Sequence, residues 1–430
     1  MVHSLSTRAL LLGILIGAGC SPSAEPATGG TGGRSPAASG GAVGHSGGAT
    51  AVGGGDPVGT GGSSSSSGGS FQAGTGGAAQ ASGGTPASST GGASTGSGGG
   101  APLGGRGTAS GGAGPVGGRS GSPDPGSAGD GEIDVGPDYT ASPDLKLKAG
   151  APAGFSVSFT MTSAMSKIFT GSDFNPPIPF SRSIKVFVPQ QYVDGTESPF
   201  MVSSDGFYGG LQTVVQNLAD DPNPDHHVPP LVIIGIQNGP DGDHATSERS
   251  LEYDTVSDRY WRFVTTEVIP AVLANAALKA KFPNFKLTSD PNGRGGYGCS
   301  SGGPAVMGLA WFGDFNRVFS FSGSLVAIQP TTDHPFGAWE YAAMITAAPF
   351  RPDLRVFLEV GEHDNRYTEP EANHSNWVIS NRAVAAALMA KGNHYRLVFA
   401  KGAGHCDNNA RNEVMPDGLI WLWRGYQASK

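Results

Sequence analysis

The chain is poor in charged residues, and it has no cluster of Lys and Arg. Its 430 residues include 27 Lys and Arg against 35 Asp and Glu, so the formal net charge is −8. Nucleic-acid binding needs a concentrated cationic surface that faces the phosphates. Without a cluster of Lys and Arg, the sequence also gives no support for electrostatic attraction to anionic lipid. We therefore expect no nucleic-acid partner.

Aliphatic, aromatic and charged side chains are nearly absent from residues 21–131. Of the 70 glycines, 43 lie before Ile133, and Phe71 and Leu103 stand almost alone as large apolar residues. Such a segment cannot bury enough apolar surface to offset the entropy lost on ordering. We predict a disordered Gly/Ser/Ala-rich linker over 21–132 and one folded domain over 133–430.

The first twenty residues predict an export signal. An apolar run at 9–16 is too short for a membrane-spanning helix, and it gives way to small residues before Cys20. This end resembles a bacterial lipoprotein processing site, in which the cysteine is lipidated, although Gly17 stands where such sites usually carry Leu. We expect a membrane-anchored lipoprotein, at the outer membrane or cell surface in a Gram-negative source. Ordinary secretion is the alternative.

Short apolar segments alternate with helical patterns after the linker. The predicted strands are 155–159, 183–188, 200–202, 231–236, 317–321, 355–360 and 395–399. The predicted helices are 211–218, 258–273, 300–312, 376–390 and 419–423. This alternation predicts an α/β fold with a mostly parallel sheet covered by helices on both faces. Ligands in such folds bind beyond the carboxyl ends of the strands.

Residues 298–302 read Gly-Cys-Ser-Ser-Gly and fit the G-x-S-x-G nucleophile elbow. The elbow holds its serine, here Ser300, on a sharp strand-to-helix turn that requires small neighbours. A Gly/Ser-rich chain also produces this pentamer by chance, so a plain glycine turn is the alternative. The helical pattern that follows favours the elbow. The preceding segment 294–297 is poorer in aliphatic residues than such strands usually are.

A serine hydroxyl needs a base to take its proton and a carboxylate to orient that base. Asp364 follows the predicted strand 355–360, with Glu362 as its competitor. His405 lies in a glycine-rich turn after the last predicted strand. The order Ser300, Asp364, His405 is that of α/β-hydrolases. The predicted reaction is carboxylic ester hydrolysis through an acyl-enzyme, with no metal and no organic cofactor.

The oxyanion intermediate of this reaction needs two backbone N–H donors. The amide of Ser301 directly follows the nucleophile and is one candidate. The second should come from the turn after an earlier strand, where Gly206 and Phe207 are the candidates. Asp205 before them is expected to cap that turn.

The chain has only three cysteines, and two of them adjoin the predicted site. Cys299 precedes Ser300, and Cys406 follows His405. A hydrogen bond between the serine and the histidine would bring the two cysteines within disulfide range, and an exported protein can keep such a bond. Two independent buried cysteines are the alternative. No ligand set with zinc spacing accompanies them.

Several further stretches carry a resemblance to a known family. They are RSIKVFVP at 182–189, DG at 205–206, SLEYD at 250–254, DRY at 258–260, DPNGR at 290–294, CSSGG at 299–303, FSFSGS at 319–324 and WLWR at 421–424. From about residue 149 to 426 the chain resembles the esterase family related to enterochelin esterases and esterase D. The resemblance implies an α/β-hydrolase fold and assigns the triad to Ser300, Asp364 and His405. It also suggests that Arg249 contacts substrate, unless that residue forms an exposed ion pair.

The two cysteines depart from that family pattern. The Cys-Ser, Asp, His-Cys arrangement looks like that of tannases and fungal-type feruloyl esterases, and it favours esters of phenolic acids or plant polysaccharides. A siderophore esterase, an acyltransferase and a non-catalytic surface binding protein are the alternatives. Three tryptophans either line an acyl or sugar pocket or belong to the core; they are Trp311, Trp339 and Trp377.

Overall fold

The computed structural model describes residues 126–151, 153–172, 177–239 and 248–427, which belong to one compact unit. The predicted signal with Cys20, and the predicted linker as far as residue 125, lie outside the described residues. Within the described part of the chain, no helix has both the length and the apolar character needed to cross a membrane.

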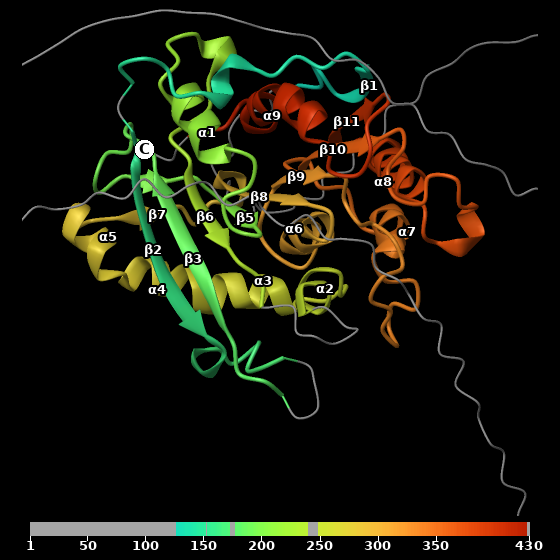
Figure 1. Ribbon diagram of the computed structural model, residues 1–430, viewed down its shortest axis with the longest axis horizontal. Helices are drawn as coiled ribbons and strands as arrows, with labels where there is room; N and C mark the ends of the chain where they lie inside the picture. The colour runs from blue at the N-terminus through green and yellow to red at the C-terminus, as the bar shows by residue number, and fades with distance from the viewer. Residues whose placement is uncertain (1–125, 152, 173–176, 240–247, 428–430) are drawn as a thin grey trace, which may run out of the picture. The chain divides into compact units, whose positions relative to one another are not determined.

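A nine-stranded sheet forms the centre of the unit, in the order β1-β11-β10-β9-β8-β5-β6-β3-β2 (Figure 1). Its strands are β1 (Gly131–Val135), β2 (Phe155–Thr162), β3 (Ser181–Val188), β5 (Phe200–Ser204), β6 (Val232–Ile236), β8 (Arg294–Cys299), β9 (Arg317–Phe321), β10 (Arg355–Gly361) and β11 (His394–Ala400). Only the β2–β3 and β3–β6 pairs are antiparallel. A separate short pair joins β4 (Glu197–Ser198) and β7 (Lys286–Leu287).

Helices cover both faces of this sheet. They are α1 (Leu211–Ala219), α2 (Glu248–Tyr253), α3 (Arg259–Phe263), α4 (Ile269–Ala274), α5 (Ala276–Lys281), α6 (Gly302–Trp311), α7 (Tyr341–Ala347), α8 (Trp377–Lys391) and α9 (Asn408–Trp423). Apolar side chains of α1 and α9 share one core with the sheet, whereas α3, α4, α6, α7 and α8 share the core of the other face. The predicted α/β-hydrolase architecture is confirmed.

Strand β8 is rich in glycine because α6 approaches it closely. A Cβ atom on Gly296 would lie 2.7 Å from Cβ of Val306, and one on Gly298 would lie 2.1 Å from the Gly302 carbonyl oxygen. Side chains at these two positions would push the helix away from the strand. The glycines that made the strand hard to recognise therefore bring α6 up to the turn that carries Ser300.

Two predicted helices differ from those observed. The predicted helix 258–273 is α3 and α4 joined by a π-helical turn, Val264–Val268. The last helix is much longer than the predicted segment 419–423 because it begins at Asn408, where the side chain of Asp407 caps the amides of two following residues. Pro416 lies inside this helix and interrupts the pattern that would have revealed it.

Strand β1 places the start of the fold before the predicted boundary at Ile133. Gly131 pairs with Arg396 and Ile133 with Val398, in parallel register with β11. Just before the strand, Asp130 accepts hydrogen bonds from a neighbouring histidine and tryptophan. The predicted boundary therefore cuts through β1, because backbone pairing holds residues whose side chains carry no apolar signal.

Candidate active site

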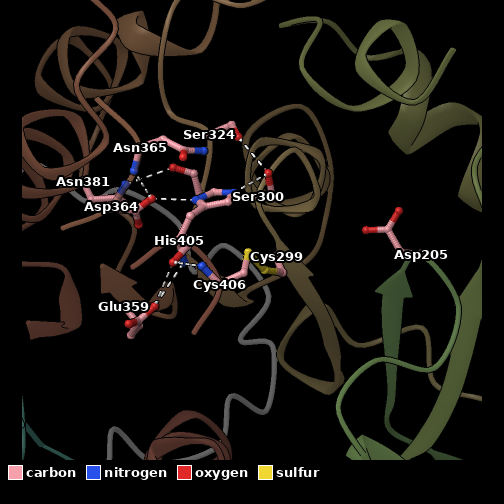
Figure 2. The surroundings of a disulfide bond; sticks show 12 residues. Asp205, Cys299, Ser300, Ser324, Glu359, Asp364, Asn365, Asn381, His405 and Cys406 are labelled. Atoms are coloured by element: carbon pink, nitrogen blue, oxygen red, sulfur yellow. Dashed lines mark hydrogen bonds and ion pairs between the residues drawn. A yellow bond between two sulfur atoms is a disulfide. The ribbon is translucent and has the colours of Figure 1, made fainter. Parts of the chain in front are cut away.

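Three loops at the carboxyl ends of β8, β10 and β11 bring Ser300, Asp364 and His405 together (Figure 2). His405 Nε2 lies 2.9 Å from Ser300 Oγ. On its other side, His405 Nδ1 lies 2.6 Å from Asp364 Oδ1. The geometry is that of a nucleophile, a base and an orienting acid.

Ser300 occupies a sharp turn between β8 and α6. Its φ is 58°, in the left-handed region that L residues rarely adopt without strain. The turn is held by its own amide, which donates to the carbonyl of Phe321, and by the Gly303 amide, which donates to the carbonyl of Ser300. The helix begins at Gly302 rather than at the predicted Ser300, so the serine projects from the turn.

Asp364 is fully buried, and its Oδ1 also accepts the amide of Asn365 at 2.6 Å. Its Oδ2 has no hydrogen-bond partner among the described residues. Glu362, the alternative acid, instead accepts the amide of Gly402 at 2.8 Å on the exposed side of the loop. The structure thus places Asp364, and not Glu362, beside the histidine.

The two candidate oxyanion donors after β5 differ in whether their amides already donate a hydrogen bond within the protein. Gly206, with φ of 83°, donates its N–H to the carbonyl of Ile236 at 3.1 Å. That amide is therefore already bonded. Over the described residues, the amides of Phe207 and Ser301 have no protein acceptor. Phe207 is accordingly the better partner for Ser301.

Arg249, predicted as a substrate contact or an exposed ion pair, forms an ion pair with Asp205 that is only partly exposed and links two turns. Its guanidinium forms hydrogen bonds of 2.7 and 2.8 Å with the carboxylate of Asp205. The same group donates to the carbonyl of Cys299 at 3.2 Å. The side chain is 22% exposed, so little of it can face a substrate.

The predicted disulfide between Cys299 and Cys406 is confirmed (Figure 2). Their Cα atoms are 6.5 Å apart, although the two residues are separated by 107 positions in the sequence. Both are buried. The bond ties the turn that carries Ser300 to the loop that carries His405.

Trp377 packs edge-on against the His405 ring, with centroids 5.9 Å apart and planes at 83°. It is 7% exposed, so it supports the histidine and offers no open face to a ligand. Trp311 and Trp339 are half-buried and contact Tyr341 and His374 respectively. None of the three tryptophan side chains is fully exposed.

Three polar residues near the triad were not predicted. Ser324 lies with its Oγ 3.4 Å from Ser300 Oγ, and its amide donates to the carbonyl of Ser300. Ser322 and Glu359 lie beneath the histidine loop. The only signal in the sequence was the family-like stretch 319–324, which holds both serines.

The chain matches the model of the Putative esterase family over residues 178–409, more than half of its length. It is a member of that family. The esterase match spans β3 to the start of α9 and so contains every residue of the triad. A comparison with curated proteins finds no match.

Solved structures similar to this esterase have low identity to it. A ferulic acid esterase is 16% identical with a TM-score of 0.45, covering 64% of this chain and 100% of that one. The enterobactin esterase FES from Shigella flexneri is 20% identical with a TM-score of 0.42, covering 62% of this chain and 59% of that one. The BES protein from Bacillus cereus is 15% identical with a TM-score of 0.42, covering 62% of this chain and 94% of that one.

Proposed function

We propose that this esterase is a serine hydrolase of carboxylic esters that works through an acyl-enzyme. The observation that carries the proposal is the continuous hydrogen-bonded chain from Asp364 through His405 to Ser300. In the first step Ser300 Oγ attacks the ester carbonyl while His405 Nε2 takes its proton. The Asp364 carboxylate accepts a hydrogen bond from the Nδ1–H of His405 and stabilises the imidazolium that forms.

The negative charge of the tetrahedral intermediate falls on the former carbonyl oxygen. The amides of Phe207 and Ser301 are the proposed donors to it. Collapse of the intermediate breaks the ester C–O bond, and His405 returns the proton to the leaving alcohol. A water molecule then repeats the sequence on the acyl-enzyme and releases the acid.

The proposed substrates are esters of phenolic acids or of polysaccharides. The pairing of Cys299 with Cys406 supports this choice, because the arrangement resembles that of tannases and feruloyl esterases. The proposed location is outside the cytoplasm, with Cys20 as a lipid-anchored N-terminus or else with ordinary secretion. A buried disulfide supports export, since such bonds persist in oxidising compartments.

The test is hydrolysis of p-nitrophenyl acetate, methyl ferulate and an enterobactin-type trilactone by the oxidised full-length chain, with Ser300→Ala as control. We expect turnover of the ferulate ester that is lost in the variant, together with fluorophosphonate labelling of Ser300. Preference for the trilactone would favour a siderophore esterase. Transfer to an added alcohol in excess of hydrolysis would favour an acyltransferase. Neither turnover nor labelling would contradict the proposal and favour a binding protein.

A further inference from the structure

Glu359 is a carboxylic acid in the middle of the sheet. It lies on β10 opposite Phe321 of β9 and Val398 of β11, and it is fully buried. A polar group in such a place destabilises the fold unless it is hydrogen-bonded. The proposed ester hydrolysis assigns it no chemical step.

The hydrogen bonds of Glu359 lead to the histidine loop (Figure 2). Its Oε2 accepts the amide of Ser322 at 3.2 Å and the hydroxyl of Ser322 at 3.3 Å. The Ser322 hydroxyl oxygen in turn accepts the amide of Cys406 at 3.0 Å. A buried relay therefore connects β10 with the residue that directly follows His405.

The backbone at Ser322 and Cys406, two members of this relay, needs to be held. Ser322 has a φ of 45° and Cys406 a φ of 50°, conformations that non-glycine residues keep only where their surroundings impose them. The disulfide restrains the Cys406 side chain, whereas the Ser322 hydroxyl restrains the Cys406 amide. Together the two contacts fix the peptide from which the His405 side chain extends.

We propose that Glu359 and Ser322 are positioning residues for His405, acting through the amide of Cys406. The inference rests on the proposed function, in which His405 Nε2 must stay within hydrogen-bond reach of Ser300 Oγ. A misplacement of about 1 Å at such a site can cost about 100-fold in rate. Loss of the relay leaves Cys406 held by its disulfide but without an acceptor for its amide.

The surroundings of Glu359 disfavour a negative charge on its carboxyl group. Burial, and then the charge of Asp364, raise the pKa of Glu359 well above its ordinary value. The charge of Asp407 acts in the same direction, and the other titratable groups facing it are Tyr139 and Tyr297. Glutamine at position 359 would keep an acceptor oxygen for Ser322.

The decisive variants are made in the full-length chain. Ser322→Ala and Ser322→Gly remove the hydroxyl, and glycine also removes any strain of the positive φ. Glu359→Ala removes the acceptor and Glu359→Gln retains it. The matched control is Ser320→Ala, since Ser320 is equally buried on β9 and its hydroxyl has no partner among the described residues.

With p-nitrophenyl acetate we expect kcat to fall about tenfold, with KM unchanged, in both Ser322 variants and in Glu359→Ala. Glu359→Gln and Ser320→Ala should stay within about twofold of the parent chain. Equal kcat in Ser322→Ala and Ser320→Ala would overturn the proposal. A fall in Glu359→Gln as large as in Glu359→Ala would overturn the acceptor role.

A readout that does not depend on turnover separates this inference from the proposed function. NMR of the His405 ring reports its titration and the low-field proton on Nδ1. We expect that proton signal to broaden, and the His405 titration to move, in Ser322→Ala but not in Ser320→Ala. If Ser300-dependent turnover is absent from the parent chain, the proposed function fails while the NMR comparison still decides the relay. Unchanged spectra in Ser322→Ala would overturn it.

Discussion

Arg249 and Asp205 form a two-point ion pair, with Nε–Oδ1 and Nη2–Oδ2 distances of 2.7 and 2.8 Å. The same Nη2 donates to the carbonyl of Cys299 at 3.2 Å. Asp205 begins the turn that leads to the Phe207 amide, and Cys299 directly precedes Ser300. One guanidinium therefore couples the two backbone turns that are proposed to hold the oxyanion.

Replacing Arg249 with Met should misalign those turns. We expect kcat to fall roughly 10- to 100-fold while KM changes little, because the oxyanion is present only in the transition state. Steady-state kinetics on p-nitrophenyl acetate measures both parameters. The matched control is Arg262→Met, at a half-exposed ion pair on α3, which should leave kcat and KM unchanged. A rise in KM with kcat preserved would instead indicate a direct contact between Arg249 and substrate.

The disulfide should contribute to both stability and rate. It closes a loop across 107 positions, for which the loss of unfolded-state entropy predicts about 5 kcal/mol in the free energy of unfolding. The variant Cys299→Ala/Cys406→Ala should show that loss in urea unfolding, and its kcat should fall as the His405 loop loosens. Cys20→Ser, which leaves the bond intact, is the control. Equal urea midpoints for the double variant and the parent chain would contradict the prediction.

Asp364 and Glu362 are two residues apart but should differ sharply in their effect on rate. Asp364→Asn leaves the volume unchanged but removes the charge at 2.6 Å from His405 Nδ1, so we expect kcat to fall about 10³- to 10⁴-fold. Glu362→Gln retains an oxygen for the Gly402 amide and should leave kcat near that of the parent chain. Similar losses in both variants would mean that the acid is wrongly assigned.

Asp254 should make the fold more stable as the pH falls. It is fully buried after α2, and its carboxylate accepts the hydroxyl of Ser250 at 2.6 Å. Burial raises the pKa of Asp254 to about 6, and the hydrogen bonds lower it by less. A raised carboxyl pKa adds stability that is fully present below the unfolded value of about 3.9 and is lost as the pH rises through 6.

The side chain in Asp254→Asn stays neutral at every pH. The variant therefore loses the pH dependence that Asp254 gives to the free energy of unfolding. We expect the variant to be more stable than the parent chain at pH 8, by up to about 3 kcal/mol, and the difference to vanish near pH 4. Urea unfolding at a series of pH values measures the gap. A gap that is the same at pH 4 and pH 8 would show that the carboxyl titrates normally.

Asp364 and His405 could be found from the sequence because each lies just after a recognisable strand, whereas Ser300 was found from the G-x-S-x-G pentamer at 298–302. In a parallel sheet those positions converge on one edge, so chain order was enough to place Ser300, Asp364 and His405 together. The disulfide followed from the same convergence, because both cysteines are immediate neighbours of triad members.

Other parts of the site depend on contacts between distant segments. The Gly206 amide already donates to the carbonyl of Ile236 on a neighbouring strand. No local sequence pattern reveals this hydrogen bond. Glu359 looks like an ordinary polar residue in a strand, and its role emerges only where Ser322 approaches it. Strand β1 contains few apolar residues, so its pairing with β11 could not be read from composition.

The position of β1 has a mechanical consequence. The chain enters the sheet at its edge, and at the far end of β1 the Lys401 amide donates to the carbonyl of Val135 at 2.9 Å. Close by, the Tyr139 hydroxyl donates to the carbonyl of Lys401 at 2.7 Å. A pull on the chain before Gly126 therefore loads the β1–β11 ladder in shear, along the strand that leads to His405. Backbone pairing thus ties the start of the described unit to the strand that leads to His405.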